Sequence, residues 1–191
     1  MKTLKYVIVL FAFVGLSLVG CSDEPQSPVA PIDQSTLAKV IVTNFTFSHY
    51  PIGLTGEGEV KLVGGNWILK NFGVTELISS SDPLAAGTMI HYLSGRMDAI
   101  TGEGPVHGSW TLTPQANTCG GVWEGNYTGY RSKKPGSDTL YVLPLQLVGH
   151  GRGGTIGGMQ TRYNSTITAW GTPPAGWYGS GEGFYKSHGG H

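Results

Sequence analysis

Three glutamates stand at the centre of a motif that the chain repeats. Glu57, Glu103 and Glu182 each lie in a Thr-Gly-Glu-Gly or Ser-Gly-Glu-Gly sequence. Carboxylates that gather in space would serve acid–base catalysis or calcium binding. The motif recurs, however, so we interpret each copy as a hairpin corner, and a barrel would spread its corners around a rim. We therefore expect a structural or solvated role for these side chains.

The histidines and a glycine fingerprint suggest two further kinds of chemistry. His188 and His191, with His107 or His150, would offer imidazoles to zinc, but no two of them combine the spacing and the rigid carrier of a zinc site. The letters of Gly149-x-Gly151-x-x-Gly154 match a dinucleotide fingerprint. A strand pattern follows them where a helix is required. We expect neither a metal nor a cofactor.

Signatures of nucleophilic catalysis are missing from the sequence. It contains no Gly-x-Ser-x-Gly elbow. Cys119 stands in Asn-Thr-Cys-Gly-Gly, where no neighbouring base would form the thiolate that a catalytic cysteine needs. The sequence nominates no catalytic residue, and the balance is against an enzyme.

The N-terminal stretch has the pattern of an export signal. Lys2 and Lys5 precede an apolar run, Tyr6 to Val19, which is shorter than the roughly 20 residues that cross a bilayer. Leu18-Val19-Gly20-Cys21 resembles the lipobox of bacterial lipoproteins. The resemblance implies that the Cys21 thiol takes a diacylglyceryl group, that the chain is cut before Cys21, and that the new amino end is acylated, as by palmitate. An uncleaved anchor helix and an ordinary secretory signal are the alternatives.

This resemblance implies a domain order and a location. Residues 1–20 would be the signal peptide, 21–36 a proline-rich tether and 37–191 a single β domain. Ser22-Asp23-Glu24 resembles the acidic export signal of surface lipoproteins in Bacteroidota, and Ser22 does not match the signal that retains lipoproteins in the inner membrane. We expect an outer-membrane lipoprotein, periplasmic or surface-exposed, whose membrane contact is its lipid.

The composition indicates an all-β domain and excludes nucleic acid as a partner. Glycine reaches 31 of 191 residues while charged residues make up only 13%. Such a chain is poor in helix formers and rich in turn positions. It has no basic stripe that would hold phosphates. With lipid on Cys21, Cys119 would have no intramolecular partner, so no disulfide is expected.

Alternation of apolar and polar residues predicts the strands. From Val40 onward Ile41, Phe45 and Phe47 share one face. We interpret Gly64-Gly65 as a bulge or corner within one long strand that resumes at Trp67.

The pattern over 88–100 fits a strand or a helix, and its glycines favour a strand with His91 on the apolar face. Trp177-Tyr178 and Phe184-Tyr185 are expected to pair as a last hairpin that closes the sheet.

The repeats carry a second, weaker resemblance. The first two copies lead to Trp67 and Trp110, which we expect to enter the core behind the corners. A shared Gly-x-Gly-x-x-x-Gly spacing at 102–108 and 151–157 resembles the hairpins of the allene oxide cyclase and dirigent-like group of barrels. The resemblance implies a small antiparallel barrel of about eight strands. A β-sandwich is the alternative, and those families' acid and base residues find no match here.

The predicted role is noncatalytic: binding of a small apolar molecule or glycan, or a structural part of the envelope. The alternative is a barrel isomerase or cyclase that acts on a small apolar substrate. A hollow interior would favour binding or catalysis, and a filled one a structural module. Ordinary core packing competes with a lining role for the candidate residues. These are His91, Trp67, Trp110, Trp123, Tyr127, Met159 and Tyr163.

Overall fold

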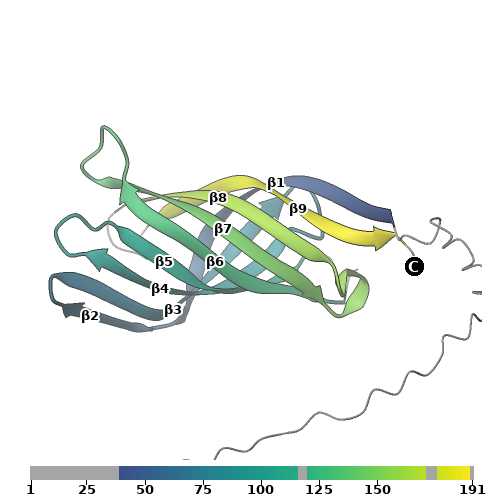
Figure 1. Cartoon of the computed structure of the whole chain (residues 1–191), viewed down its shortest axis with the longest axis horizontal. Helices are drawn as coiled ribbons and strands as arrows, with labels where there is room; N and C mark the ends of the chain where they lie inside the picture. Colours follow the sequence, from purple (N-terminus) through teal and green to yellow (C-terminus); the bar gives the residue numbers. More distant parts are fainter. Residues whose placement is uncertain (1–38, 116–119, 171–175, 190–191) are drawn as a thin grey trace, which may run out of the picture. The chain divides into compact units, whose positions relative to one another are not determined.

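The computed structural model describes residues 39–115, 120–170 and 176–189. They form a closed antiparallel barrel of eight strands with one extra strand, β2, added beside β3 (Figure 1). The hydrogen-bonded order is β1-β9-β8-β7-β6-β5-β4-β3-β2, and a further pairing of β1 with β3 closes the barrel. The strands are β1 (Lys39–Gly56), β2 (Glu59–Val63), β3 (Asn66–Ser80), β4 (Gly87–Asp98), β5 (Gly104–Pro114), β6 (Val122–Lys133), β7 (Leu140–Arg152), β8 (Gln160–Trp170) and β9 (Trp177–Gly189).

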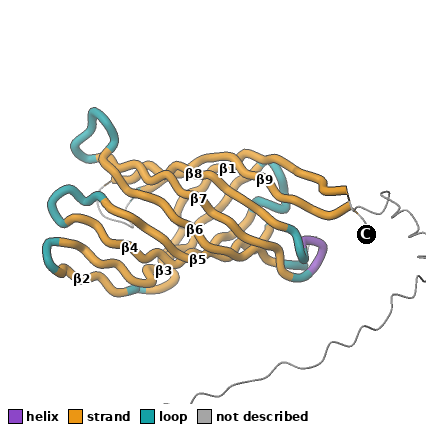
Figure 2. Tube along the Cα trace, viewed as in Figure 1, coloured by secondary structure: helices purple, strands orange, loops and turns teal. Residues whose placement is uncertain are grey.

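The predicted all-β barrel of about eight strands is confirmed. Among the described residues the only helical segment is η2 (Gly154–Ile156), one 3₁₀ turn between β7 and β8 (Figure 2). The sandwich alternative is wrong, because β1 pairs with both β9 and β3 and leaves one continuous sheet.

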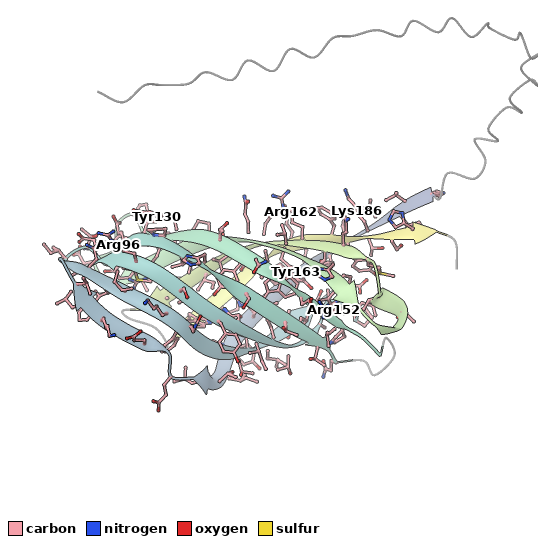
Figure 3. All side chains as sticks on the ribbon, turned by 60° about the horizontal axis from the view of Figure 1, so that its bottom comes forward. Arg96, Tyr130, Arg152, Arg162, Tyr163 and Lys186 are labelled. Atoms are coloured by element: carbon pink, nitrogen blue, oxygen red, sulfur yellow. The ribbon has the colours of Figure 1, made fainter. Side chains whose placement is uncertain are left out.

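Strict alternation sends successive side chains to the inside and the outside of the barrel. Along β4, Met89, His91 and Leu93 are buried while their neighbours are exposed or half-buried. This confirms a strand over most of 88–100. In β8, Tyr163 lies inside the barrel, whereas Arg162 beside it projects from the outer face (Figure 3).

Aromatic rings fill much of the interior, and Tyr163 stands among them. Its ring makes edge contacts with Phe45, Phe47 and Trp110, at centroid separations of 5.0, 5.2 and 5.5 Å. Aromatic pairs favour such tilted contacts. Ile41, which we expected beside Phe45, is instead 47% exposed, because the first residues of β1 pair with β9 alone.

Two expected strand arrangements are wrong. Gly64-Gly65 is the turn of a hairpin between β2 and β3, with φ of 55° and 74°. Both residues of such a tight turn need positive φ, which glycine adopts without strain. The final segment is a single strand, β9, and not a hairpin; Gly179–Gly189 of β9 pair with β1.

The repeated motif does not have one structural meaning. Its first two copies lie at the β1–β2 and β4–β5 connections, as expected, but Ser180-Gly181-Glu182-Gly183 lies within β9. The two tryptophans also differ. Trp110 is buried, whereas Trp67 is 41% exposed, because its hairpin runs on into β2, a strand that pairs only with β3.

Glycines one or two strands away leave space for the interior rings. A methyl group on Gly183 would lie 2.6 Å from the Phe45 ring, and one on Gly149 would lie 2.6 Å from the ring of Trp110. Interiors packed to crystal-like density cannot absorb such an overlap without displacement. The high glycine content is therefore partly a packing requirement of this barrel.

Gly149→Ala should destabilise the barrel by about 1–3 kcal/mol, because the added methyl group must displace Trp110 or the β6 backbone. Urea unfolding followed by tryptophan fluorescence measures the effect. Gly53→Ala is the matched control, since a methyl group there meets nothing within 4 Å. Equal stability of the two variants would contradict the packing argument.

Candidate functional site

A cluster of buried polar side chains crosses the interior where the sheet closes. It joins His49 of β1, Glu76 of β3, His91 of β4, Ser165 of β8 and Trp177 of β9. These residues are 4%, 2%, 6%, 4% and 7% exposed, respectively. Buried polar groups are costly unless they are paired, so the bonds within the cluster decide what it can do.

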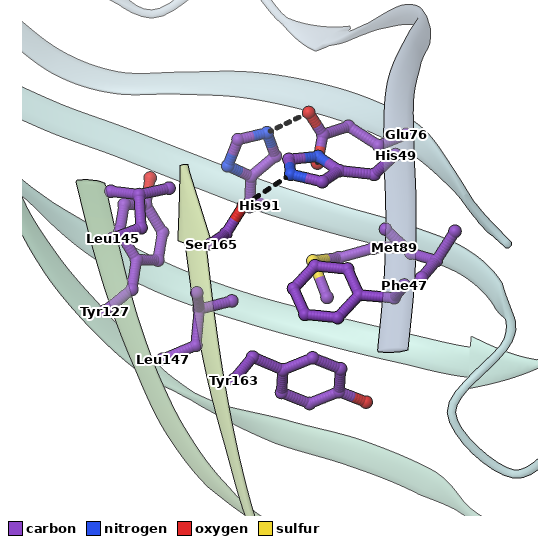
Figure 4. A pocket seen from close by; sticks show the side chains of 11 residues that line it. Phe47, His49, Glu76, Met89, His91, Tyr127, Leu145, Leu147, Tyr163 and Ser165 are labelled. Atoms are coloured by element: carbon purple, nitrogen blue, oxygen red, sulfur yellow. Dashed lines mark hydrogen bonds and ion pairs between the residues drawn. The ribbon is translucent and has the colours of Figure 1, made fainter. Parts of the chain in front are cut away.

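The cluster is a chain of hydrogen bonds that starts at Glu76 (Figure 4). The Trp177 indole N–H donates to Glu76 Oε1 at 2.6 Å. Oε2 of the same carboxylate lies 3.0 Å from His49 Nδ1, and His49 Nε2 lies 2.8 Å from Ser165 Oγ. An ionised carboxylate only accepts, so Nδ1 must carry the proton that it donates to Glu76. In the neutral imidazole Nε2 then accepts from the Ser165 hydroxyl.

Glu76 is held in its charged form. Burial favours the neutral acid, but the hydrogen bond and electrostatic influence of His49, the electrostatic influence of His91 and the indole N–H of Trp177 outweigh it. The pKa of Glu76 is therefore lowered below its ordinary 4.5. The barrel carries a carboxylate in its interior at neutral pH.

His91 is the neutral neighbour of this chain. Burial lowers the pKa of His91 below 6.5; the nearby Glu76 carboxylate opposes this shift and His49 adds to it. Its Nε2 lies 3.8 Å from Glu76 Oε1, too far for a hydrogen bond. Within the described part of the chain this nitrogen has no hydrogen-bond partner.

Glu76 and His49 each occupy an inward position next to apolar residues on the same face of their strand. Glu76 lies between Val74 and Ile78, and His49 follows Phe47. This in-phase placement is a signal that the sequence carries and that our sequence reasoning missed for His49, Glu76 and Ser165. The sequence alone does not show that these three residues meet, because they come from strands that are distant along the chain.

A glycine lets the His49 ring cross the neighbouring strand. His49 pairs with Gly179 of β9, and Ser165 lies one strand further, on β8. A methyl group on Gly179 would overlap the imidazole. Because Gly179 has no side chain, the His49 ring can pass over β9 and reach Ser165.

The space beside the cluster is small. A cavity of about 20 Å³ lies among residues that include His49, Glu76, His91, Tyr127 and Ser165. A second, of about 30 Å³, borders residues that include Met97, Arg131 and Tyr141. Each has room for about one water molecule. The interior of the barrel is thus largely filled. A filled interior favours a structural role for the centre of the barrel over ligand binding there.

A wider cleft opens at the hairpin end of the barrel, which we call the mouth cleft. It has about 400 Å³. The guanidinium carbon of Arg131 lies 3.5 Å from the Tyr141 ring centroid, and Nη1 donates to the Gly102 carbonyl at 2.6 Å. Arg131, Tyr141 and Met97 also border the second cavity. The full lining is Val60, Trp67, Leu69, Phe72, Met97, Ala99, Ile100, Gly102, Arg131 and Tyr141.

The structure distributes the predicted lining residues over three places. Those that border the central cavity are His91, Tyr127 and Tyr163. Trp67 borders the mouth cleft. The remaining three pack in or against the core: Trp110, Trp123 and Met159. The indoles of Trp110 and Trp123 donate to the carbonyls of Asn126 and Leu84. Cys21 and Cys119 lie outside the described residues.

No protein-family model, curated protein or solved structure matches this chain. Within the described residues no helix has the length and apolar character to span a bilayer. Arguments about function therefore start from the cluster and the mouth cleft.

Stability should fall as the pH drops below about 6.5, because the unfolded chain then protonates His91 while the folded barrel keeps it neutral. Below about 4.5 the loss should steepen, since the folded state also holds Glu76 ionised. His91→Gln should reduce the slope between pH 5 and 6.5 by up to about 1.4 kcal/mol per pH unit. Urea unfolding across pH measures it.

The control for this experiment is His107→Gln, at an exposed position of β5. It should leave the pH slope unchanged. An unaltered slope in His91→Gln would show that His91 is not the group that takes up the proton.

Proposed function

We propose that this protein is an exported lipoprotein of the bacterial envelope that binds a small apolar molecule in the mouth cleft. The observation that carries the proposal is the cleft itself, about 400 Å³ and lined mainly by apolar side chains. Pockets for small ligands typically have about 300–1,000 Å³ and few polar groups.

Exposed apolar side chains at the mouth support a binding role over a purely structural one. Ile100 is 93% exposed, Val60 50% and Trp67 41%, and all three line the same cleft. Contiguous apolar surface is unfavourable in water and usually marks an interaction site. The apolar lining favours an apolar molecule over a glycan, whose hydroxyl groups would find few partners beyond Arg131 and Tyr141.

Ile100→Glu should weaken binding of phenylnaphthylamine, a neutral apolar fluorophore, by about tenfold, or about 1.4 kcal/mol. The carboxylate would have to be desolvated against the ligand. Because Ile100 is exposed, the fold should be unaffected. Fluorescence titration measures binding, and native mass spectrometry of protein from its producing organism seeks the retained molecule.

Val148→Glu is the matched control, since Val148 is 51% exposed but lies on the outer wall of the barrel. It should bind the fluorophore as the wild type does. Equal affinity of Ile100→Glu and Val148→Glu would locate binding elsewhere and contradict the proposal.

Attachment to the envelope rests on the lipobox resemblance at Cys21. Two or more acyl chains hold a protein at a membrane where one binds reversibly. Cys21→Ser should therefore stop cleavage before residue 21 and remove the mature protein from the envelope fraction, as measured by fractionation and mass spectrometry. Unchanged processing and sedimentation would refute lipidation.

A further inference from the structure

We propose that Ser165 is an activated nucleophile, with His49 as its base and Glu76 as the residue that orients His49, and that it accepts the acyl group of a small ester. The proposal goes beyond ligand binding at the mouth. Ser165, His49 and Glu76, which we call the relay, border the central cavity. None of the three borders the mouth cleft.

The hydroxyl, the imidazole and the carboxylate stand in the order that activation of a nucleophile requires. The hydroxyl lies 2.8 Å from the imidazole, and the imidazole lies 3.0 Å from the carboxylate. Both distances are within the hydrogen-bond reach expected of a nucleophile, its base and an orienting group. Since Glu76 can only accept, it fixes the His49 tautomer that leaves Nε2 basic towards Ser165.

The positions of these groups are fixed before any substrate arrives. Trp177 holds the second oxygen of Glu76 at 2.6 Å, so the carboxylate cannot turn away from His49 without losing that bond. Phe47 packs beside the His49 ring, at a centroid separation of 5.9 Å. Preorganised groups of this kind do not have to reorganise during reaction.

A structural role alone explains the cluster less well. Buried ionic groups are often no more stabilising than apolar side chains of the same volume. The cluster also leaves His91 Nε2 without a hydrogen-bond partner among the described residues, and an unpaired buried polar atom is destabilising. His91 borders both interior cavities, so a polar group of a bound molecule can meet this nitrogen.

The reaction balances with water as the second substrate. Ser165 Oγ attacks the ester carbonyl carbon, and as the new C–O bond forms the hydroxyl proton passes to His49 Nε2. The carbonyl re-forms as the C–O bond to the alcohol breaks, and the leaving oxygen takes that proton. Water then attacks the acyl-serine with the same proton transfers and releases a carboxylic acid and free Ser165.

The size of the interior limits the substrate to the shortest acyl groups. The central cavity has room for about one water molecule, which is the second substrate. An acetyl group would require displacement of flexible neighbours such as Met89 and Leu147. The two interior cavities share His91, Tyr127 and Leu145, and the outer one shares Met97, Arg131 and Tyr141 with the mouth cleft. These shared walls mark a route from the mouth.

The test uses two small probes on the full mature chain: p-nitrophenyl acetate, which acylates serine, and methanesulfonyl fluoride, which sulfonylates it. We expect release of nitrophenol and attachment of one group to Ser165, located by peptide mass spectrometry. Ser165→Ala should abolish the labelling. Ser187→Ala, at a half-buried position of β9 outside the cluster, is the control and should label as the wild type does.

Glu76→Gln separates a relay from a structural bond. The amide oxygen would accept from Trp177, so the amide N–H₂ would face His49 Nδ1 and force the proton onto Nε2. The base would be lost while the shape is kept, and labelling of Ser165 should slow by at least about 100-fold. Circular dichroism checks that the variant is folded. If it is not, His49→Gln is used in its place.

Two results would overturn the proposal. One is a folded wild-type protein whose Ser165 takes up neither probe. The other is labelling of Ser165 that is equally fast in the wild type and in the folded Glu76→Gln or His49→Gln variant, since reaction would then not need the relay. Failure of either kind leaves binding at the mouth intact, because that is measured with a different probe and a different variant, Ile100→Glu.

Discussion

The pairing of β1 with two partners is the constraint on which the rest of this structure depends. β1 pairs with β9 along one edge and with Gly73–Ser80 of β3 along the other. These two pairings close a sheet that would otherwise end in two open edges. Closure removes unpaired backbone groups from the main sheet and gives every strand an inside and an outside. It also brings His49 between Glu76 and Ser165, which no local contact would do.

Closure of the barrel brings together the residues that hold a charged carboxylate, Glu76, at its centre. Glu76 is tolerated because His49 and Trp177 satisfy both of its oxygens, and these three residues come from three different strands. Loss of either His49 or Trp177 would leave the buried Glu76 carboxylate without one of its hydrogen bonds. The same bonds that make the carboxylate tolerable also leave His49 with a basic nitrogen beside a hydroxyl, so stability and potential chemistry have a common origin.

The centre and the mouth of the barrel differ in what they offer a ligand. Large rings and the polar cluster occupy the centre, where the remaining cavities are of about 20 and 30 Å³. At the mouth the β2–β3 hairpin runs beyond the closed wall and holds Trp67 over a cleft of about 400 Å³. A barrel can thus be filled and still present an apolar site, provided that the site lies on an extension of the sheet.

The sequence by itself determined the all-β class, the inward faces of strands such as β4, and a barrel of about eight strands, because alternation and turn glycines are local properties. It also placed His91 on an apolar face. It did not distinguish the hairpin at Gly64-Gly65 from a bulge. It also predicted a hairpin corner for every copy of the Gly-Glu-Gly motif, although the third copy lies within β9. Only the tertiary structure decided that Trp67 lies at the surface and that His49, Glu76 and Ser165 meet. The physical reason is that their contacts depend on which strands become neighbours when the sheet closes. Alternation assigns each residue to a face of its strand, but it does not name the strand that will lie beside it.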